Sequence, residues 1–121
     1  MQNSDQKEMQ KMQNIDELET VLYAGNLLLS SGAEIYRAEE TMHRIADAMH
    51  IKDLDAYVTN RGIFASGNVP GKGIESRIMS VPDKELNIDK IEAVNELSRE
   101  VCSNRMDLLY LKTSLQNIAN M

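Results

Sequence analysis

Apolar residues recur at helical spacing in two stretches of the N-terminal half of the chain. The first stretch predicts a helix over residues 15–31, and Asn14 with Glu17 resembles a capping box at its start. Gly32 can end this helix, because a residue without Cβ adopts the left-handed conformation without strain. A second apolar stripe predicts a helix over residues 33–50, so the two helices should form a hairpin or a sharp corner.

Gly25 lies on the apolar stripe of the first predicted helix. Its lack of a side chain lets another element approach closely, at a cost of up to about 1 kcal/mol in helix propensity. We therefore interpret it as a packing glycine.

The apolar period changes between residues 54 and 81, where three short segments rich in β-branched or aromatic residues alternate with turn sequences. These segments predict three strands, and their connections are too short for a parallel crossover, so an antiparallel meander is expected. The connection GNVPGKG (67–73) lies between two strands and lacks the Walker arrangement. We interpret it as a hairpin turn rather than a phosphate-binding loop.

Two further helical patterns complete the chain. An apolar stripe over residues 88–101 predicts a third helix, entered through Asn87 or the segment 82–85, and Asp107 is the expected N-cap of a fourth. The order ααβββαα predicts a single α+β domain of two layers, in which helices cover one face of a small antiparallel sheet.

Composition limits the classes of protein that fit this pattern. A length of 121 residues suits one domain, which we place at 14–121 after a flexible polar N-terminus at 1–13. The net charge of -6 argues against nucleic-acid or anionic-lipid partners. No apolar run approaches the roughly 18 residues that cross a bilayer, so we expect a soluble domain in the cytoplasm. Cys102 cannot form an intramolecular disulfide, and we interpret it as an apolar filler on the third helix.

The second predicted helix carries two polar strips beside its apolar stripe, one with Glu34, Arg37, Thr41 and Arg44, the other with Tyr36, Glu40, His43, Asp47 and His50. The simplest interpretation is an exposed surface with intrahelical ion pairs, Glu40 with Arg44 and Glu39 with His43.

Metal binding and nucleophilic catalysis both find weak support in the sequence. His43, Asp47 and His50 have a spacing that a metal ion permits, but no HExxH motif or Cys cluster accompanies them, so we expect no metal and no cofactor. No GxSxG elbow is present. We interpret the candidate nucleophiles as strand or turn residues, namely Thr59, Ser66 and Ser76.

Four segments in order, LLLSSGAEIYRAEETMHRIADAMHI, AYVTNRGIFAS, SRIMSV and NIDKIEAVNELSRE, resemble the N-terminal domain of the bacterial threonine/serine exporter family. The resemblance covers about residues 18–118, and its most specific part is G-A-E-x-x-R-x-E at 32–39. Supporting positions are Thr59, Arg77, Asn95, Ser98 and Arg99.

This resemblance implies a cytosolic domain that precedes a bundle of membrane helices exporting small amino acids or, in a related branch, moving dicarboxylates. The chain ends at Met121, where such membrane segments should begin, so we expect an excised domain or one part of a split system. The expected place is the cytoplasmic face of the bacterial inner membrane. The expected partner is the membrane-spanning region of the same or another protein, and the expected role is regulation or assembly without transport by this piece alone.

The resemblance also directs attention to particular charges, and we predict a polar substrate-binding site from Glu34, Arg37, Glu39, Thr59 and Arg77. Two arginines, Arg37 and Arg77, suit the carboxylate of a small amino acid or a dicarboxylate. Two alternatives stay open: a hydrolase that uses Glu34 or Glu39 with Thr59, and an assembly module that forms a homo-oligomer through apolar helix surface.

Overall fold

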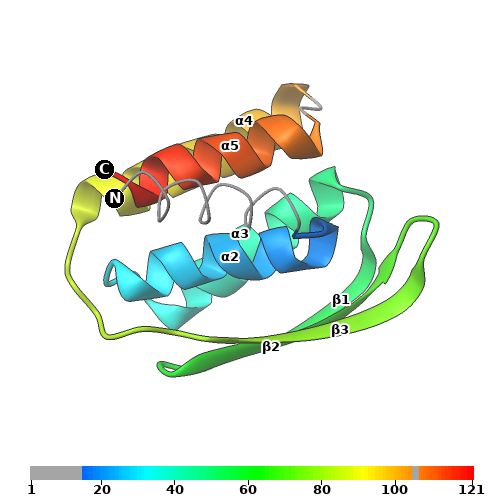
Figure 1. The fold of residues 1–121 in the computed structure, drawn as a ribbon, viewed down its shortest axis with the longest axis horizontal. Coiled ribbons are helices and arrows are strands. Elements are labelled where there is room, and N and C mark those ends of the chain that lie inside the picture. Colours follow the sequence, from blue (N-terminus) through cyan, green and yellow to red (C-terminus); the bar gives the residue numbers. More distant parts are fainter. Residues whose placement is uncertain (1–14, 105–106) are drawn as a thin grey trace, which may run out of the picture.

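Residues 15–104 and 107–121 are described by the computed structural model, and they form four helices and a three-stranded sheet (Figure 1). The elements in chain order are α2 (Glu17–Ser30), α3 (Ile35–Ala48), β1 (Lys52–Val58), β2 (Gly62–Val69), β3 (Gly73–Ser80), α4 (Ile88–Asn104) and α5 (Leu108–Ala119). The helices lie on one side of the sheet, which confirms the predicted α+β class and its two layers. The helical layer has two tiers, because α2 and α3 contact strands whereas α4 and α5 contact only helices.

The first helix begins at a different cap from the one that the sequence pattern suggested. Asp16 caps α2, and its Oδ1 accepts a hydrogen bond from the Glu19 N–H at 2.8 Å. Asn14 lies outside the described residues. Both positions have a glutamate three residues later, so the spacing alone could not choose between them.

The ends of α2 and α3 use the same left-handed turn. Gly32 has a φ of 97°, and the Ala33 N–H donates to the Leu28 carbonyl at 2.9 Å, which confirms the predicted helix end. At the end of α3, His50 takes the left-handed position with a φ of 62°, and the Ile51 N–H reaches back to α3 in the same way. The His50 backbone therefore closes a helix, at a position that the metal interpretation assigned to a ligand.

The sheet is the predicted antiparallel meander, with strand order β1-β2-β3. Ala65 of β2 pairs with Ala56 on one side and with Arg77 on the other, and β2 pairs with β3 without any shift in register. The hairpin between them turns through Gly71 and Gly73, both of which have positive φ. The interpretation of GNVPGKG as a hairpin connection is thus confirmed.

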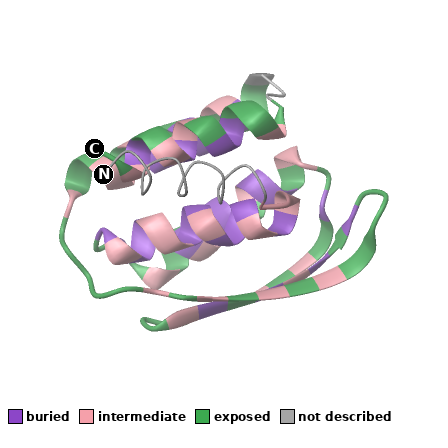
Figure 2. Cartoon of the chain, viewed as in Figure 1, coloured by how far each residue is buried: buried purple, intermediate pink, exposed green. Residues whose placement is uncertain are grey.

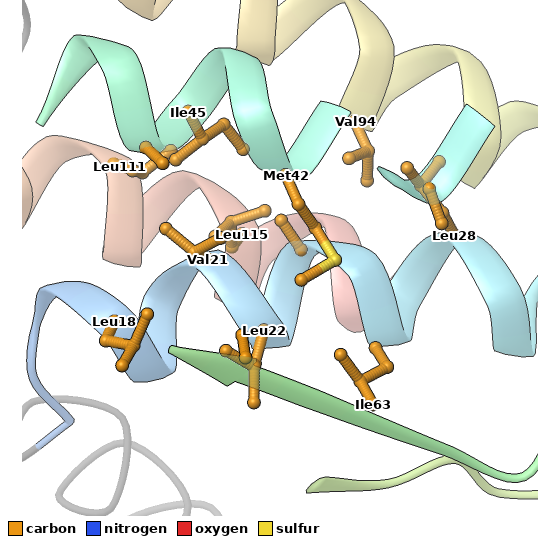
Figure 3. Close-up of a cluster of buried hydrophobic side chains, with 14 of the residues drawn as sticks. Leu18, Val21, Leu22, Leu28, Met42, Ile45, Ile63, Val94, Leu111 and Leu115 are labelled. Carbon is orange, nitrogen blue, oxygen red and sulfur yellow. The ribbon is translucent and has the colours of Figure 1, made fainter. Parts of the chain in front are cut away.

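The core is centred on α2, whose buried side chains contact both the sheet and the upper helices (Figures 2 and 3). Gly25 lies where α3 and β2 come closest to α2. A Cβ at Gly25 would stand 2.6 Å from the Met42 Sδ and 3.2 Å from the Ile63 Cδ1, so the close approach expected from the sequence is present.

The segment between β3 and α4 pairs with the C-terminal end of α2. The Glu85 N–H donates to the Ser30 carbonyl and the Asn87 N–H to the Ser31 carbonyl, each at 2.9 Å. Asn87 is also the side-chain cap of α4, since its Oδ1 accepts from the Lys90 N–H at 3.0 Å. Asp107 caps α5 in the same way at 2.8 Å, so both sequence-predicted caps are confirmed.

Replacing Gly25 with leucine tests the close packing around α2. We expect Gly25→Leu to lower the free energy of unfolding by about 1–3 kcal/mol, because the new side chain overlaps Met42 and Ile63. Urea unfolding followed by circular dichroism measures the change. Adding Met42→Ala to the same chain makes room and should return part of the loss, whereas independent, additive effects of the two substitutions would contradict the proposed overlap.

Candidate functional site

A polar groove lies between α3 and α4 and encloses about 170 Å³. We call it the α3–α4 groove. Its wall carries three arginines and one glutamate beside neutral polar groups. The residues are Tyr36, Arg37, Glu40, Thr41 and Arg44 from α3, and Asn95 and Arg99 from α4.

Helical spacing explains why these side chains meet. Arg37, Thr41 and Arg44 follow one another at steps of four and three residues and therefore occupy one strip of α3. The sequence interpretation left this strip in solvent, which is wrong, because α4 packs against it and Thr41 is only 1% exposed. Asn95 and Arg99, four residues apart, present the matching strip of α4.

Neutral hydrogen bonds join the two helices beneath the groove. The Thr41 hydroxyl donates to the Asn95 Oδ1 at 3.3 Å, and the Arg44 Nη1 donates to the Ser98 Oγ at 3.0 Å. The Ser98 hydroxyl donates in turn to the Asn95 carbonyl of its own helix at 2.7 Å. The buried hydroxyls of Thr41 and Ser98 are thereby satisfied, as buried polar groups usually are.

The three arginines of the groove differ in how their charge is balanced. Arg44 forms the predicted ion pair with Glu40, 3.2 Å between Nη2 and Oε1. Arg37 and Arg99 form no hydrogen bond or ion pair with another side chain among residues 15–104 and 107–121. The groove therefore holds two guanidinium groups, one from each helix, whose charge no described carboxylate balances.

Cys102 follows the groove residues on α4 but is exposed, so its interpretation as an apolar filler is wrong. Its thiol donates to the Arg44 carbonyl at 3.2 Å. Partial burial raises the pKa of this thiol, although the nearby Arg44 charge opposes that shift. The thiol is therefore less readily ionised than a fully solvated one.

Arg77, a predicted site residue, ties β3 to the N-terminus of α2. Its Nη2 lies 2.5 Å from the Asp16 Oδ2 and its Nε lies 3.3 Å from the Glu19 Oε1. Burial by itself raises the pKa of Asp16, but the Glu19 N–H and the Arg77 guanidinium together outweigh it and hold that pKa below its ordinary value. Arg77 thus has partners at α2 and does not line the α3–α4 groove.

The remaining predicted site residues are also placed apart from one another. The Thr59 hydroxyl donates to the Gly62 carbonyl at 3.0 Å and accepts from the N–H groups of Arg61 and Gly62, so Thr59 is a turn residue, as one interpretation held. Glu34 stands exposed before α3 and makes no side-chain capping bond. No hydrogen bond within the described ranges joins Thr59 to Glu34 or Glu39, the pairing that a hydrolase would use. Of the five predicted substrate-binding residues, only Arg37 lines the groove.

Metal ligands do not gather anywhere in the described part of the chain, since no group of three His, Cys, Asp or Glu side chains is placed to hold an ion. The helices within the same ranges are also too short or too polar to cross a membrane.

A family model described as "Putative threonine/serine exporter" (ThrE) matches residues 19–121, so the chain belongs to this family. The matched range includes every residue of the α3–α4 groove. Searches of curated proteins and of solved structures give no match to the chain.

Acidification tests the Asp16–Arg77 contact. The pKa of Asp16 is lower in the folded chain than its ordinary value of 3.8, so its stabilising contribution is complete above that value and is lost as the pH falls through the folded pKa. We expect Asp16→Asn to flatten the fall in the free energy of unfolding between about pH 5 and pH 2. Asparagine still caps a helix, so the substitution removes mainly the charge.

Urea unfolding at several pH values measures this slope. Glu40→Gln serves as the control, because the Glu40 side chain is 63% exposed and its ion pair contributes little in solvent. An acid slope that Asp16→Asn leaves unchanged would show that the Asp16–Arg77 contact does not control acid stability.

Proposed function

We propose that this member of the threonine/serine exporter family acts as a cytoplasmic regulatory domain that binds a small amino acid in the α3–α4 groove. The observation that carries the proposal is the pair Arg37 and Arg99, which line the groove from two helices and lack a partner among the described residues. In this proposal the domain lies at the cytoplasmic face of the bacterial inner membrane. Its partner is the membrane-spanning region of the same protein or of another one.

The groove chemistry suits a ligand with a carboxylate. A guanidinium group offers a planar fork of donors that matches the two oxygens of a carboxylate. Glu40 lines the same groove and can accept hydrogen bonds from an ammonium group while it remains near Arg44. Threonine and serine carry both charges and a hydroxyl, for which Tyr36 and Asn95 supply polar partners.

A regulatory role follows from where the groove lies. The ligand would contact α3 in the lower tier of helices and α4 in the upper tier, so it favours the arrangement in which these two helices are close. A ligand shifts a conformational equilibrium only as far as its affinities for the two arrangements differ, and a site built from two elements supplies such a difference. Transport itself requires polar groups that line a cavity within a bilayer, and the groove is not such a cavity.

A dicarboxylate is the second candidate ligand, and one specific observation favours it. Arg37 and Arg99 provide two positive charges without a described carboxylate partner, while Arg44 is already paired with Glu40. A ligand with two carboxylates can neutralise both arginines. The hydrolase alternative has no comparable support, because Glu34, Glu39 and Thr59 form no joint hydrogen-bonded arrangement among the described residues.

Isothermal titration of the chain with threonine, serine and succinate tests the proposal and separates the two ligands. We expect binding that Arg37→Gln and Arg99→Gln each weaken by about tenfold to a hundredfold, the loss typical of a charge-assisted hydrogen bond. Arg61→Gln is the matched control, because Arg61 is exposed and lines a different cavity. Stronger binding of succinate than of the amino acids would select the dicarboxylate.

Two results would count against a ligand site in the groove. One is the absence of binding heat for all three ligands, and the other is binding that Arg61→Gln weakens as much as the groove substitutions do. Circular dichroism of each variant confirms that the fold is retained, so that a lost heat reports the site and not unfolding.

A further inference from the structure

β3 forms one edge of the sheet, and no described element covers its outer side. The Val81 N–H donates to the Arg61 carbonyl on the β2 side at 2.9 Å. Hydrogen-bonding direction alternates along an antiparallel strand, so odd-numbered residues of β3 bond to β2 and Ile74, Ser76 and Ile78 direct their backbone groups outward. The Ser76 carbonyl accordingly accepts a bond from the Arg77 side chain at 2.8 Å instead of one from β2.

The five residues at the middle of this edge, Ile74 to Ile78, read IESRI. Around Ser76 the sequence is symmetric in its apolar residues and opposite in its charges. If two copies of β3 pair antiparallel with Ser76 facing Ser76, each Ile74 faces an Ile78 and each Glu75 faces an Arg77. The edge is therefore complementary to itself in both hydrophobicity and charge.

Backbone hydrogen bonding permits this register. In the paired arrangement, Ser76 with its counterpart and Ile74 with Ile78 are the hydrogen-bonded pairs, and these are the residues whose backbone groups point outward. Glu75 and Arg77 then form non-hydrogen-bonded pairs, whose Cα atoms approach to about 4.5 Å and whose side chains lie closest. A shift by one residue would bring together backbone groups already bonded to β2.

The side chains of β3 gain partners on both faces of the sheet. Ile74 and Ile78 are 81% and 80% exposed, and Ile78 continues a row with Phe64 and Tyr57 across the outer face. On the inner face, the Glu75 Oε1 is buried without a hydrogen-bond partner, 3.6 Å from the Arg77 of its own chain. The Arg77 of a second copy would supply that oxygen with a donor.

The opposite edge of the sheet differs in each of these respects. β1 has a shift in register between Lys52 and Asp55, and Asp53 within it has a φ of 56°. Bulges and charged side chains are the features that keep a strand edge from pairing with another chain. One edge of the sheet is thus fit for pairing and the other is not.

We propose that two copies of this chain pair through β3 to form a two-fold symmetric dimer with a continuous six-stranded sheet. The irregular, charged β1 edges then lie at the two ends of that sheet, so assembly stops at two copies. This proposal is independent of ligand binding in the α3–α4 groove.

Sedimentation velocity over a range of concentrations tests the dimer. The unsubstituted chain is expected to dimerise, and Ser76→Pro to raise the dissociation constant at least about tenfold, because it removes both N–H donors at the centre of the pairing. Within one chain that N–H points away from β2, so the monomer should keep its fold and melting temperature. Ser80→Pro is the matched control, since Ser80 also lies on the outward side of β3 but beyond the paired segment.

Two further variants test the register. Glu75→Arg places like charges opposite each other and should also weaken the dimer. In a Cys102→Ser background, Ser76→Cys should form an interchain disulfide on oxidation, since the paired Cα atoms lie about 5.5 Å apart. Ser66→Cys, the β2 neighbour of Ser76, should not, because three strand spacings separate the two copies by about 14 Å.

Several results would overturn the proposal. They are a chain that stays monomeric at its highest soluble concentration, a dimer that Ser76→Pro and Glu75→Arg leave intact, equal crosslinking at positions 66 and 76, and open-ended oligomers in place of a dimer.

Discussion

The burial of α2 on nearly every side is the constraint from which the rest of the structure follows. α2 contacts β2 and β3 below, α3 beside it, and α4 and α5 above. Each fully buried leucine contributes about 1.5–3 kcal/mol of hydrophobic stabilisation, and Leu18, Leu22 and Leu28 are all completely inaccessible. The two ends of α2 are fixed by polar contacts, Asp16 with Arg77 at one end and the Ser30 and Ser31 carbonyls with the segment before α4 at the other.

The α3–α4 groove is a consequence of the second tier of helices. α3 places its apolar stripe toward α2 and the sheet, so α4 has to pack against a strip that carries arginine and threonine. Deep in that contact, Thr41 and Ser98 satisfy each other's neighbours through hydrogen bonds. Nearer to solvent, Arg37 remains exposed and unpaired within the described ranges, which makes its position suited to a ligand.

The fold could be predicted from the sequence because it follows from local patterns. Apolar periodicity located the helices and strands, Gly32 marked the corner, and short connections required the meander. The groove could be predicted only in part. Arg37 stood out through its motif, but Asn95 lies 54 residues from the Thr41 that bonds to it, and no local pattern specifies that pairing.

Arg77 illustrates the same limit from the opposite direction. An arginine on a strand suggested a carboxylate ligand, yet its strongest partner is Asp16, 61 residues earlier in the chain. A sequence shows that a charge is present, whereas only the tertiary structure shows which opposite charge balances it. Charge type was therefore a good guide to candidate chemistry and a poor guide to which arginine remains available.

The position of α2 also determines how distant parts of the domain can influence one another. The groove helix α3 contacts β1 but not β3, and among the described helices α2 alone contacts β3 as well as α3 and α4. An event at the β3 edge and an event in the groove therefore share no surface and are linked through α2. If α2 shifts with either event, the coupling free energy is the same in both directions, so each event changes the equilibrium of the other by an equal factor.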